Sequence, residues 1–124
     1  MNQIFLIAAG GAVGSVLRFL MSTGVHGILG RAFPYGTLAV NVVGSFIMGL
    51  LYVLLIDRFN MSGEWRAALL VGLLGGFTTF SSFSIETVNL LEAGETVKAL
   101  LNILLSVGVC ITVTWLGIII GRQV

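Results

Sequence analysis

One polar stretch lies inside a long apolar segment and is the key to the architecture. It reads GGFTTFSSFSIE, that is Gly75-Gly76-Phe77-Thr78-Thr79-Phe80-Ser81-Ser82-Phe83-Ser84-Ile85-Glu86. It holds a glycine pair, five hydroxyl side chains and an acid. Within a membrane, non-helical backbone is tolerated only where it is buried in protein or lines a cavity. A glycine pair followed by two threonines weakens helical continuity. The sequence therefore predicts a membrane helix that is broken near mid-membrane, around residues 75–79.

The same stretch predicts an ion site. Discontinuous helices in transporters bind ions at the midplane, with carbonyls facing cations and amide ends facing anions. The alternative is an unbroken helix whose hydroxyls bond back to the preceding turn. A single serine or threonine is usually of that kind. Five hydroxyls within the seven positions 78–84 favour a site.

Composition predicts an all-α integral membrane protein with a single transmembrane domain over residues 1–124. Hydrophobic residues make up 57% of the chain and charged residues 9%, against about 25% charge in soluble domains. A net charge of +1 provides no basic face for nucleic acid. The chain lacks the grouped nucleophile, base and acid that catalysis requires, so no enzyme is predicted. Four segments reach the length of about 20 residues that a membrane span needs: 3–24, 34–56, 66–91 and 97–121.

The distribution of basic residues predicts no strong orientation. With four crossings, both termini lie on one side of the membrane, and Lys and Arg set which side is cytoplasmic. The terminal side carries three basic residues and the opposite side two or three; these are Arg58, Arg66 and Arg122, against Arg31, Lys98 and the intramembrane Arg18. So small a difference allows insertion both ways, and hence an antiparallel homodimer. A weak bias that still gives one orientation is the alternative.

Phe80 and Phe83 are candidate wall residues of an ion path. They are three residues apart, so on a helix they project from nearly the same face, among hydroxyls. A phenyl ring has a positive edge, and an edge turned to the path favours an anion, while serine and threonine hydroxyls can donate to it. Phenylalanine at this spacing is otherwise ordinary core.

The fourth segment carries polar residues at steps of four, namely Asn102, Ser106, Cys110 and Thr114. They predict either a polar track for an ion or interhelical hydrogen bonds, which are the commoner use of such groups. Asn41, in the second segment, adds an amide that could face the same path.

Two charges, Arg18 and Glu86, lie inside predicted spans at similar depth. A charge at that depth is costly unless it is paired or hydrated. They predict either a mutual ion pair or a vestibule in which Arg18 attracts anions.

These motifs resemble the Fluc/CrcB family of small bacterial fluoride channels. The resemblance rests on Gly10-Gly11-Ala12-Val13-Gly14 with Arg18, on Gly36-Thr37-Leu38-Ala39-Val40-Asn41 with Gly44, and on the run from Gly72 to Glu86. It covers essentially the whole chain and implies passive, selective fluoride export. It further implies a dual-topology antiparallel homodimer with two pores, in the bacterial cytoplasmic (inner) membrane, with fluoride and the lipid bilayer as partners. A structural sodium ion at the dimer interface is also implied.

Carried over by position, the resemblance implies roles for individual residues. The backbone carbonyls of Gly75 and Thr78, from both subunits, would bind the sodium. Phe80 and Phe83 match the ring pair of the pore, Asn41 the pore asparagine, and Ser81 and Ser82 the neighbouring hydroxyls. The polar residues of the fourth segment, called here the helix-four stripe (Asn102, Ser106, Cys110 and Thr114), would be the polar track. Cys110 and Asn102 depart from the family's usual residues at these positions.

Two other functions fit the outline of four short membrane spans. A small four-helix multidrug exporter needs a titratable acid deep in its first helix, where this chain has Arg18 and no acid. A non-transporting assembly protein would use the polar groups only for packing.

Overall fold

The computed structural model describes residues 2–124, and four helices in it are long and apolar enough to cross a membrane. The first is α1 (Asn2–Leu29). The second comprises α2 (Tyr35–Val53) and the π-helical η1 (Leu54–Arg58); the third comprises α3 (Gly63–Arg66), the π-helical η2 (Ala67–Leu74), α4 (Gly75–Phe77) and α5 (Phe80–Glu92). The fourth comprises α6 (Thr96–Leu104), the π-helical η3 (Leu105–Val109) and α7 (Cys110–Gln123). The predicted all-α membrane fold with a broken third helix is confirmed.

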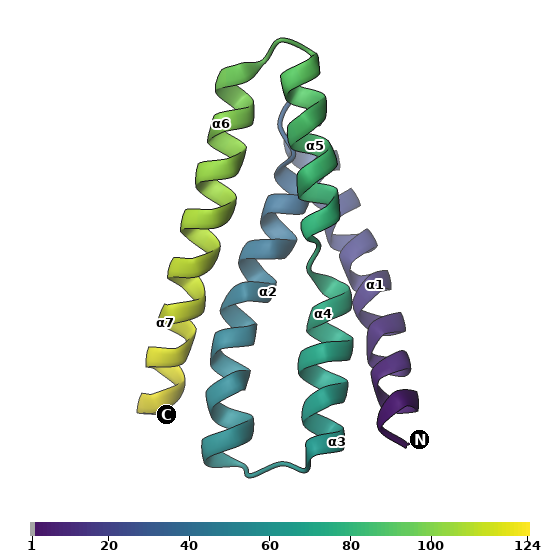
Figure 1. Cartoon of the computed structure of the whole chain (residues 1–124), viewed down its shortest axis with the longest axis vertical. Coiled ribbons are helices and arrows are strands. Elements are labelled where there is room, and N and C mark those ends of the chain that lie inside the picture. The colour runs from purple at the N-terminus through teal and green to yellow at the C-terminus, as the bar shows by residue number, and fades with distance from the viewer. Residues whose placement is uncertain (1) are drawn as a thin grey trace.

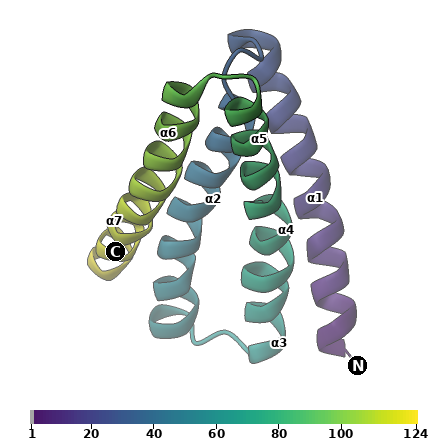
Figure 2. The ribbon, with the colours of Figure 1, turned by 45° about the horizontal axis from the view of Figure 1, so that its top comes forward.

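The four helices run alternately up and down. Both termini lie at one end of the molecule, together with the turn that joins the second helix to the third (Figure 1). The second helix lies between the fourth and the third, and α1 covers the other side of the third (Figures 1 and 2). Helix four therefore packs mainly on α2, and its main contact with the third helix is made where α6 meets α5.

The first helix is longer than the sequence predicted. Residues 25–29 lie beyond the predicted span 3–24, but α1 continues through them to Leu29. Gly24 and Gly27 have open space around them, so neither marks a close approach. The chain turns only at Gly30, whose φ of +86° favours glycine.

Glycines hold α1 against the third helix. A methyl group added at Gly10 or Gly14 would collide with the carbonyl oxygens of Ala68 and Leu73, respectively. One added at Gly76 would lie 2.8 Å from the carbonyl oxygen of Gly11. These glycines therefore serve packing within one chain. The glycine pair was predicted to weaken the helix, but both glycines are helical in α4. Gly76 instead allows α1 to pack closely against the third helix.

The second and fourth helices meet in the same way. A methyl group on Gly49 would collide with the Thr114 carbonyl oxygen, and one on Gly117 with the Phe46 carbonyl oxygen. Without a water-driven hydrophobic effect between helices in lipid, such close backbone contact is a main source of helix association.

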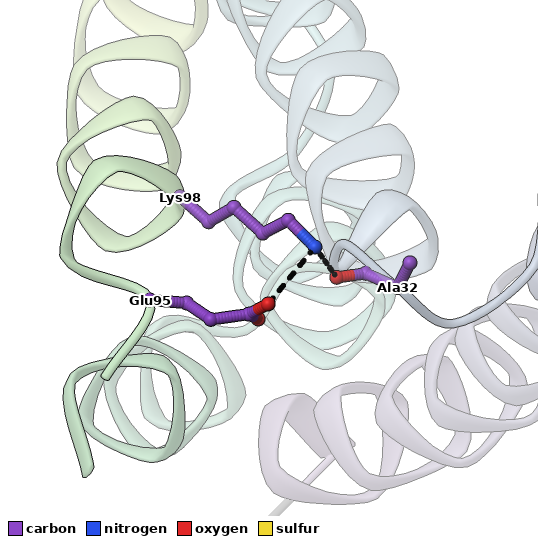
Figure 3. Close-up of polar contacts among 3 residues, drawn as sticks. All are labelled: Ala32, Glu95 and Lys98. Atoms are coloured by element: carbon purple, nitrogen blue, oxygen red, sulfur yellow. Dashed lines mark hydrogen bonds and ion pairs between the residues drawn. The ribbon is translucent and has the colours of Figure 1, made fainter. Parts of the chain in front are cut away.

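Lys98 joins the two loops at the end of the molecule opposite the termini (Figure 3). Its Nζ donates to the Ala32 carbonyl and to Glu95 Oε1, each at 3.3 Å. Both charged side chains are partly exposed, at 39% and 44%, so this link contributes at most about 1 kcal/mol to stability.

Gly14→Ala should destabilise the fold, because the added methyl group has no space beside Leu73. Overpacking of this kind costs about 1–3 kcal/mol. Thermal unfolding in detergent measures the effect. Gly27→Ala is the matched control on the same helix, since nothing lies within 4 Å of its new methyl group. Equal melting temperatures for the two variants would contradict the packing described here.

Candidate ion-binding and permeation site

The third helix breaks at Thr78 and Thr79, and Asn41 of α2 binds the broken backbone. Thr78 has φ −88° and ψ 158°, and Thr79 has φ −151° and ψ 117°, so both are extended. The Asn41 amide nitrogen donates to the Thr79 carbonyl at 2.9 Å, and the Thr79 N–H donates to Asn41 Oδ1 at 2.8 Å. One side chain therefore replaces the helical partners of both the N–H and the carbonyl of Thr79.

The break takes the helical partners from several carbonyls, among them those of Gly75 and Thr78. The Gly75 carbonyl would normally accept from the Thr79 N–H, which now donates to Asn41. The Thr78 carbonyl would normally accept from the Ser82 N–H, which donates to Thr79 Oγ1 at 3.1 Å. Gly75 is also exposed. Backbone carbonyls freed in this way are the groups that unwound membrane helices use to coordinate Na⁺.

Arg18 binds a third carbonyl of the broken segment. Its Nε donates to the Gly76 carbonyl at 3.1 Å, and a cation suits the negative end of the first half-helix. The predicted ion pair between Arg18 and Glu86 is not formed: within residues 2–124 the only salt bridge joins Lys98 to Glu95. Arg18 instead compensates its charge with the backbone that the break exposes.

The second half-helix, α5, begins at Phe80 with its amide end near mid-membrane. Thr79 caps it, accepting from the Ser82 N–H. The N–H groups of Phe80 and Ser81 start the helix and so have no carbonyl partner inside it. Such an end attracts negative charge. The break thus presents carbonyls on one side and amides on the other, as the sequence predicted for an ion site.

A groove of about 390 Å³ lies beside the break, between the third and fourth helices, with α2 as its floor. It brings together most of the predicted permeation residues. Its lining includes Asn41, Thr78, Thr79, Phe80, Phe83, Ser106, Cys110 and Thr114, together with Ser45 and Met48 of α2.

The two phenylalanines meet at the groove as the spacing predicted. Their ring centroids are 5.2 Å apart and their planes make an angle of 53°. Phe83 is buried at 8% exposure, whereas Phe80 is 74% exposed. In a single chain, one ring is therefore held in the protein and the other is uncovered.

The helix-four stripe divides between the two uses that the sequence left open. Ser106, Cys110 and Thr114 line the groove. Thr114 Oγ1 also lies 3.1 Å from the Ser45 carbonyl and 2.8 Å from the Cys110 carbonyl, either of which its proton can reach. Asn102 is not among the lining residues of the groove; it is 2% exposed and donates to Thr87 at 2.9 Å. Asn102 is thus an interhelical hydrogen-bonding residue.

A second cavity, of about 350 Å³, lies on the other side of the break and contains Arg18, Ser82 and Glu86. Arg18 and Glu86 therefore share one cavity, and the vestibule in which Arg18 attracts anions stays a prediction. Glu86 Oε1 is buried, with no hydrogen-bond partner among residues 2–124. Ser82 lines this cavity rather than the groove, and Ser81 is exposed with its Oγ 3.2 Å from Thr79 Oγ1.

Two features of the site were missed by sequence reasoning. Thr79 is both the partner of Asn41 and the cap of α5, a role that a threonine before a helix start could have indicated. His26, the single histidine of the chain, is buried in α1, and its Nε2 accepts from the Gly36 N–H at 3.0 Å. It therefore secures the start of α2 beside the second cavity.

Asn41→Leu should lower the free energy of unfolding, because it leaves the N–H and carbonyl of Thr79 without partners. Each unsatisfied buried polar group costs about 1–3 kcal/mol. Thermal unfolding in detergent, with hydrogen exchange at the Thr79 amide, measures the loss. Asn89→Leu is the control, since Asn89 is exposed. Unchanged exchange at Thr79 would contradict the role of Asn41.

The chain is similar to known proteins over nearly its whole length. The model of the family described as "CrcB-like protein, Camphor Resistance (CrcB)" matches residues 5–118. Fluoride-specific ion channel FluC from Geobacter sulfurreducens is 53% identical over 99% of both chains, and that from Magnetococcus marinus is 50% identical over 98% of this chain and 99% of its own. The FluC protein of Methylococcus capsulatus is 53% identical over 98% of this chain, which spans only about half (53%) of that protein. The chain is thus a multi-pass membrane protein, and it belongs to the CrcB family.

Proposed function

We propose that this chain forms a fluoride-selective channel, in which the anion passes along the groove between the broken third helix and helix four. The observation that carries the proposal is the break itself. It brings the amide end of α5 and the Phe80 and Phe83 rings to one groove, which Ser106 lines from the fourth helix, inside a membrane protein. The relatives named above are described as fluoride-specific ion channels.

Fluoride suits these groups chemically. A small anion sheds water in a narrow path only if donors of fixed position replace its hydration shell. Free amides, hydroxyls and the positive edges of phenyl rings are such donors. None of them is a full charge, so the ion is not bound too tightly to leave. The second cavity, with Arg18, gives anions a place to gather before they enter.

The transport is passive. Fluoride crosses membranes as the neutral acid, dissociates at the higher internal pH and is trapped as an anion, which a channel lets flow out down its gradient. No phosphate-binding loop with its lysine occurs in the sequence, so nothing couples ATP. An ion channel of this kind carries out no covalent chemistry. The membrane is the bacterial cytoplasmic (inner) membrane.

The functional unit is an antiparallel homodimer. Four helices of one chain leave the groove open and Phe80 74% exposed. A second, inverted copy would cover this face and close two equivalent paths. The near balance of basic residues on the two sides of the membrane supports insertion in both orientations.

A sodium ion at the dimer centre would hold the two breaks together. The Gly75 and Thr78 carbonyls are the candidate ligands, because Asn41 and Thr79 take the N–H groups that would otherwise satisfy them. Among residues 2–124, no three His, Cys, Asp or Glu side chains gather into a metal site. Carbonyl oxygens suit a hard cation, whose charge would offset their desolvation.

Proteoliposomes loaded with fluoride should release it through the purified protein, with chloride released far more slowly. A fluoride electrode and a chloride electrode measure the two fluxes. Equal fluxes, or none of either, would refute a fluoride channel. Proton-dependent transport of a lipophilic cation would instead favour the multidrug exporter.

Phe80→Leu should reduce fluoride flux by roughly two- to tenfold, the range expected for loss of one aromatic contact. Phe5→Leu is the matched control, since Phe5 is equally exposed, at 68%, on α1 and away from the groove. Size-exclusion chromatography checks that both variants still dimerise. If the protein served only in assembly and transported nothing, neither substitution would change fluoride flux.

Replacing sodium with N-methylglucamine should lower the melting temperature of the detergent-solubilised dimer, because a ligand that binds only the folded state stabilises it, by an amount that rises with the logarithm of the ligand concentration above its Kd. Restoring sodium should recover the temperature, and equimolar choline should not. A melting temperature independent of sodium would remove the ion from the proposal without affecting the fluoride path.

A further inference from the structure

Asn102 touches neither face of the groove, yet its side chain connects both walls. Its Nδ2 donates to Thr87 Oγ1 at 2.9 Å, and Thr87 Oγ1 donates to the Phe83 carbonyl at 2.7 Å. On its other side, Asn102 Oδ1 accepts from Ser106 Oγ at 3.4 Å. Phe83 and Ser106 line the groove from opposite helices, whereas Asn102 and Thr87 lie behind them, 2% and 6% exposed.

The direction of every hydrogen bond in this chain follows from its last acceptor. The Phe83 carbonyl can only accept, so the single hydroxyl proton of Thr87 points to it. Thr87 Oγ1 must then accept from Asn102, which places the NH₂ group of the amide toward Thr87. Asn102 Oδ1 therefore faces Ser106, and the Ser106 proton points to Asn102.

This direction matters for an anion. A serine hydroxyl has one proton and two lone pairs. With its proton turned to Asn102, Ser106 offers the groove lone pairs, which repel fluoride. The Ser106–Asn102 bond is long, at 3.4 Å, against 2.5–3.0 Å for a normal O–H···O bond. Ser106 can therefore turn its proton to an anion, but it must give up the contact with Asn102 to do so.

We propose that Asn102 is a positioning residue that sets how readily Ser106 donates to the permeating anion, and that Thr87 fixes the orientation of the Asn102 amide. This rests on the proposed fluoride path along the groove. By competing for the Ser106 proton, Asn102 weakens anion binding at this point, so the ion does not remain there. The site thus sets a balance between entry and release, which a conducting path requires.

Asn102→Leu frees the Ser106 proton and should lower the fluoride concentration that half-saturates efflux by roughly two- to tenfold, the range of one net hydrogen bond. Initial efflux rates from proteoliposomes at a series of internal fluoride concentrations measure it. In a Ser106→Ala background the same change should produce no shift. A shift of equal size in both backgrounds overturns the proposal, because a purely structural effect of Asn102 does not depend on the Ser106 hydroxyl.

Thr87 provides a second test that keeps Asn102 in place. Thr87→Val removes the group that fixes the amide, so the amide can turn its NH₂ toward Ser106 and release the proton. It should shift half-saturation in the same direction as Asn102→Leu, while Thr87→Ser, which retains the hydroxyl, should not. Thr112→Val is the control, since that hydroxyl bonds only to the Gly108 carbonyl of its own helix. Identical behaviour of Thr87→Val and Thr87→Ser contradicts the proposal.

A readout without transport separates this inference from the proposed function. In wild-type protein and Thr87→Ser, one side-chain amide proton of Asn102 should exchange slowly with solvent in NMR spectra, and in Thr87→Val it should exchange faster. Equal exchange in all three overturns the hydrogen-bond direction. If the amide proton shows this exchange pattern but the protein moves no fluoride, the proposed channel function is refuted. The direction of the hydrogen bonds from Ser106 through Asn102 and Thr87 to Phe83 would still be established.

Discussion

The structure depends on the two hydrogen bonds between the Asn41 side chain and the Thr79 backbone. A broken helix inside a membrane is tolerated only if another group satisfies the peptide units that leave the helical ladder. Asn41 satisfies the N–H and the carbonyl of Thr79 with a single amide. Its presence on α2 therefore allows the third helix to have two ends within its length, and these ends place polar backbone groups beside the groove.

The two ends separate opposite charges. The first half-helix ends in carbonyls, and Arg18 binds that of Gly76, while the Gly75 carbonyl is left free. The second half-helix begins in amides beside Phe80 and the groove. A cation site and an anion path can therefore lie a few residues apart on one segment. The close packing of α1 through Gly10, Gly14 and Gly76 supports this arrangement by holding the segment against a neighbouring helix.

Several features of the site could be predicted from single residues, and others could not. The break, the pairing of Phe80 with Phe83, and the shared end of the termini follow from local chemistry and from counting spans. The ion pair of Arg18 with Glu86, one of the two predicted alternatives, is wrong. Similar depth in the membrane does not say which group lies nearest, and the nearest acceptor for Arg18 is the Gly76 carbonyl. The glycine pair was taken as the break, but the close approach of α1 keeps it helical, and only the two threonines leave the helix.

The class of protein, the four spans and the polar segment follow from the sequence alone, because hydrophobic length and hydroxyl clustering are properties of adjacent residues. How the stripe on helix four is used depends on the tertiary structure. The π-helical η3 widens the turn between Asn102 and Cys110, so residues four apart drift less around the axis than on an α-helix. The polar residues therefore stay close to one face, and what each contacts depends on its height along the helix: Asn102 lies opposite α5, whereas Ser106, Cys110 and Thr114 line the groove. That division depends on which helix lies opposite each residue, and periodicity along one segment carries no information about its neighbours.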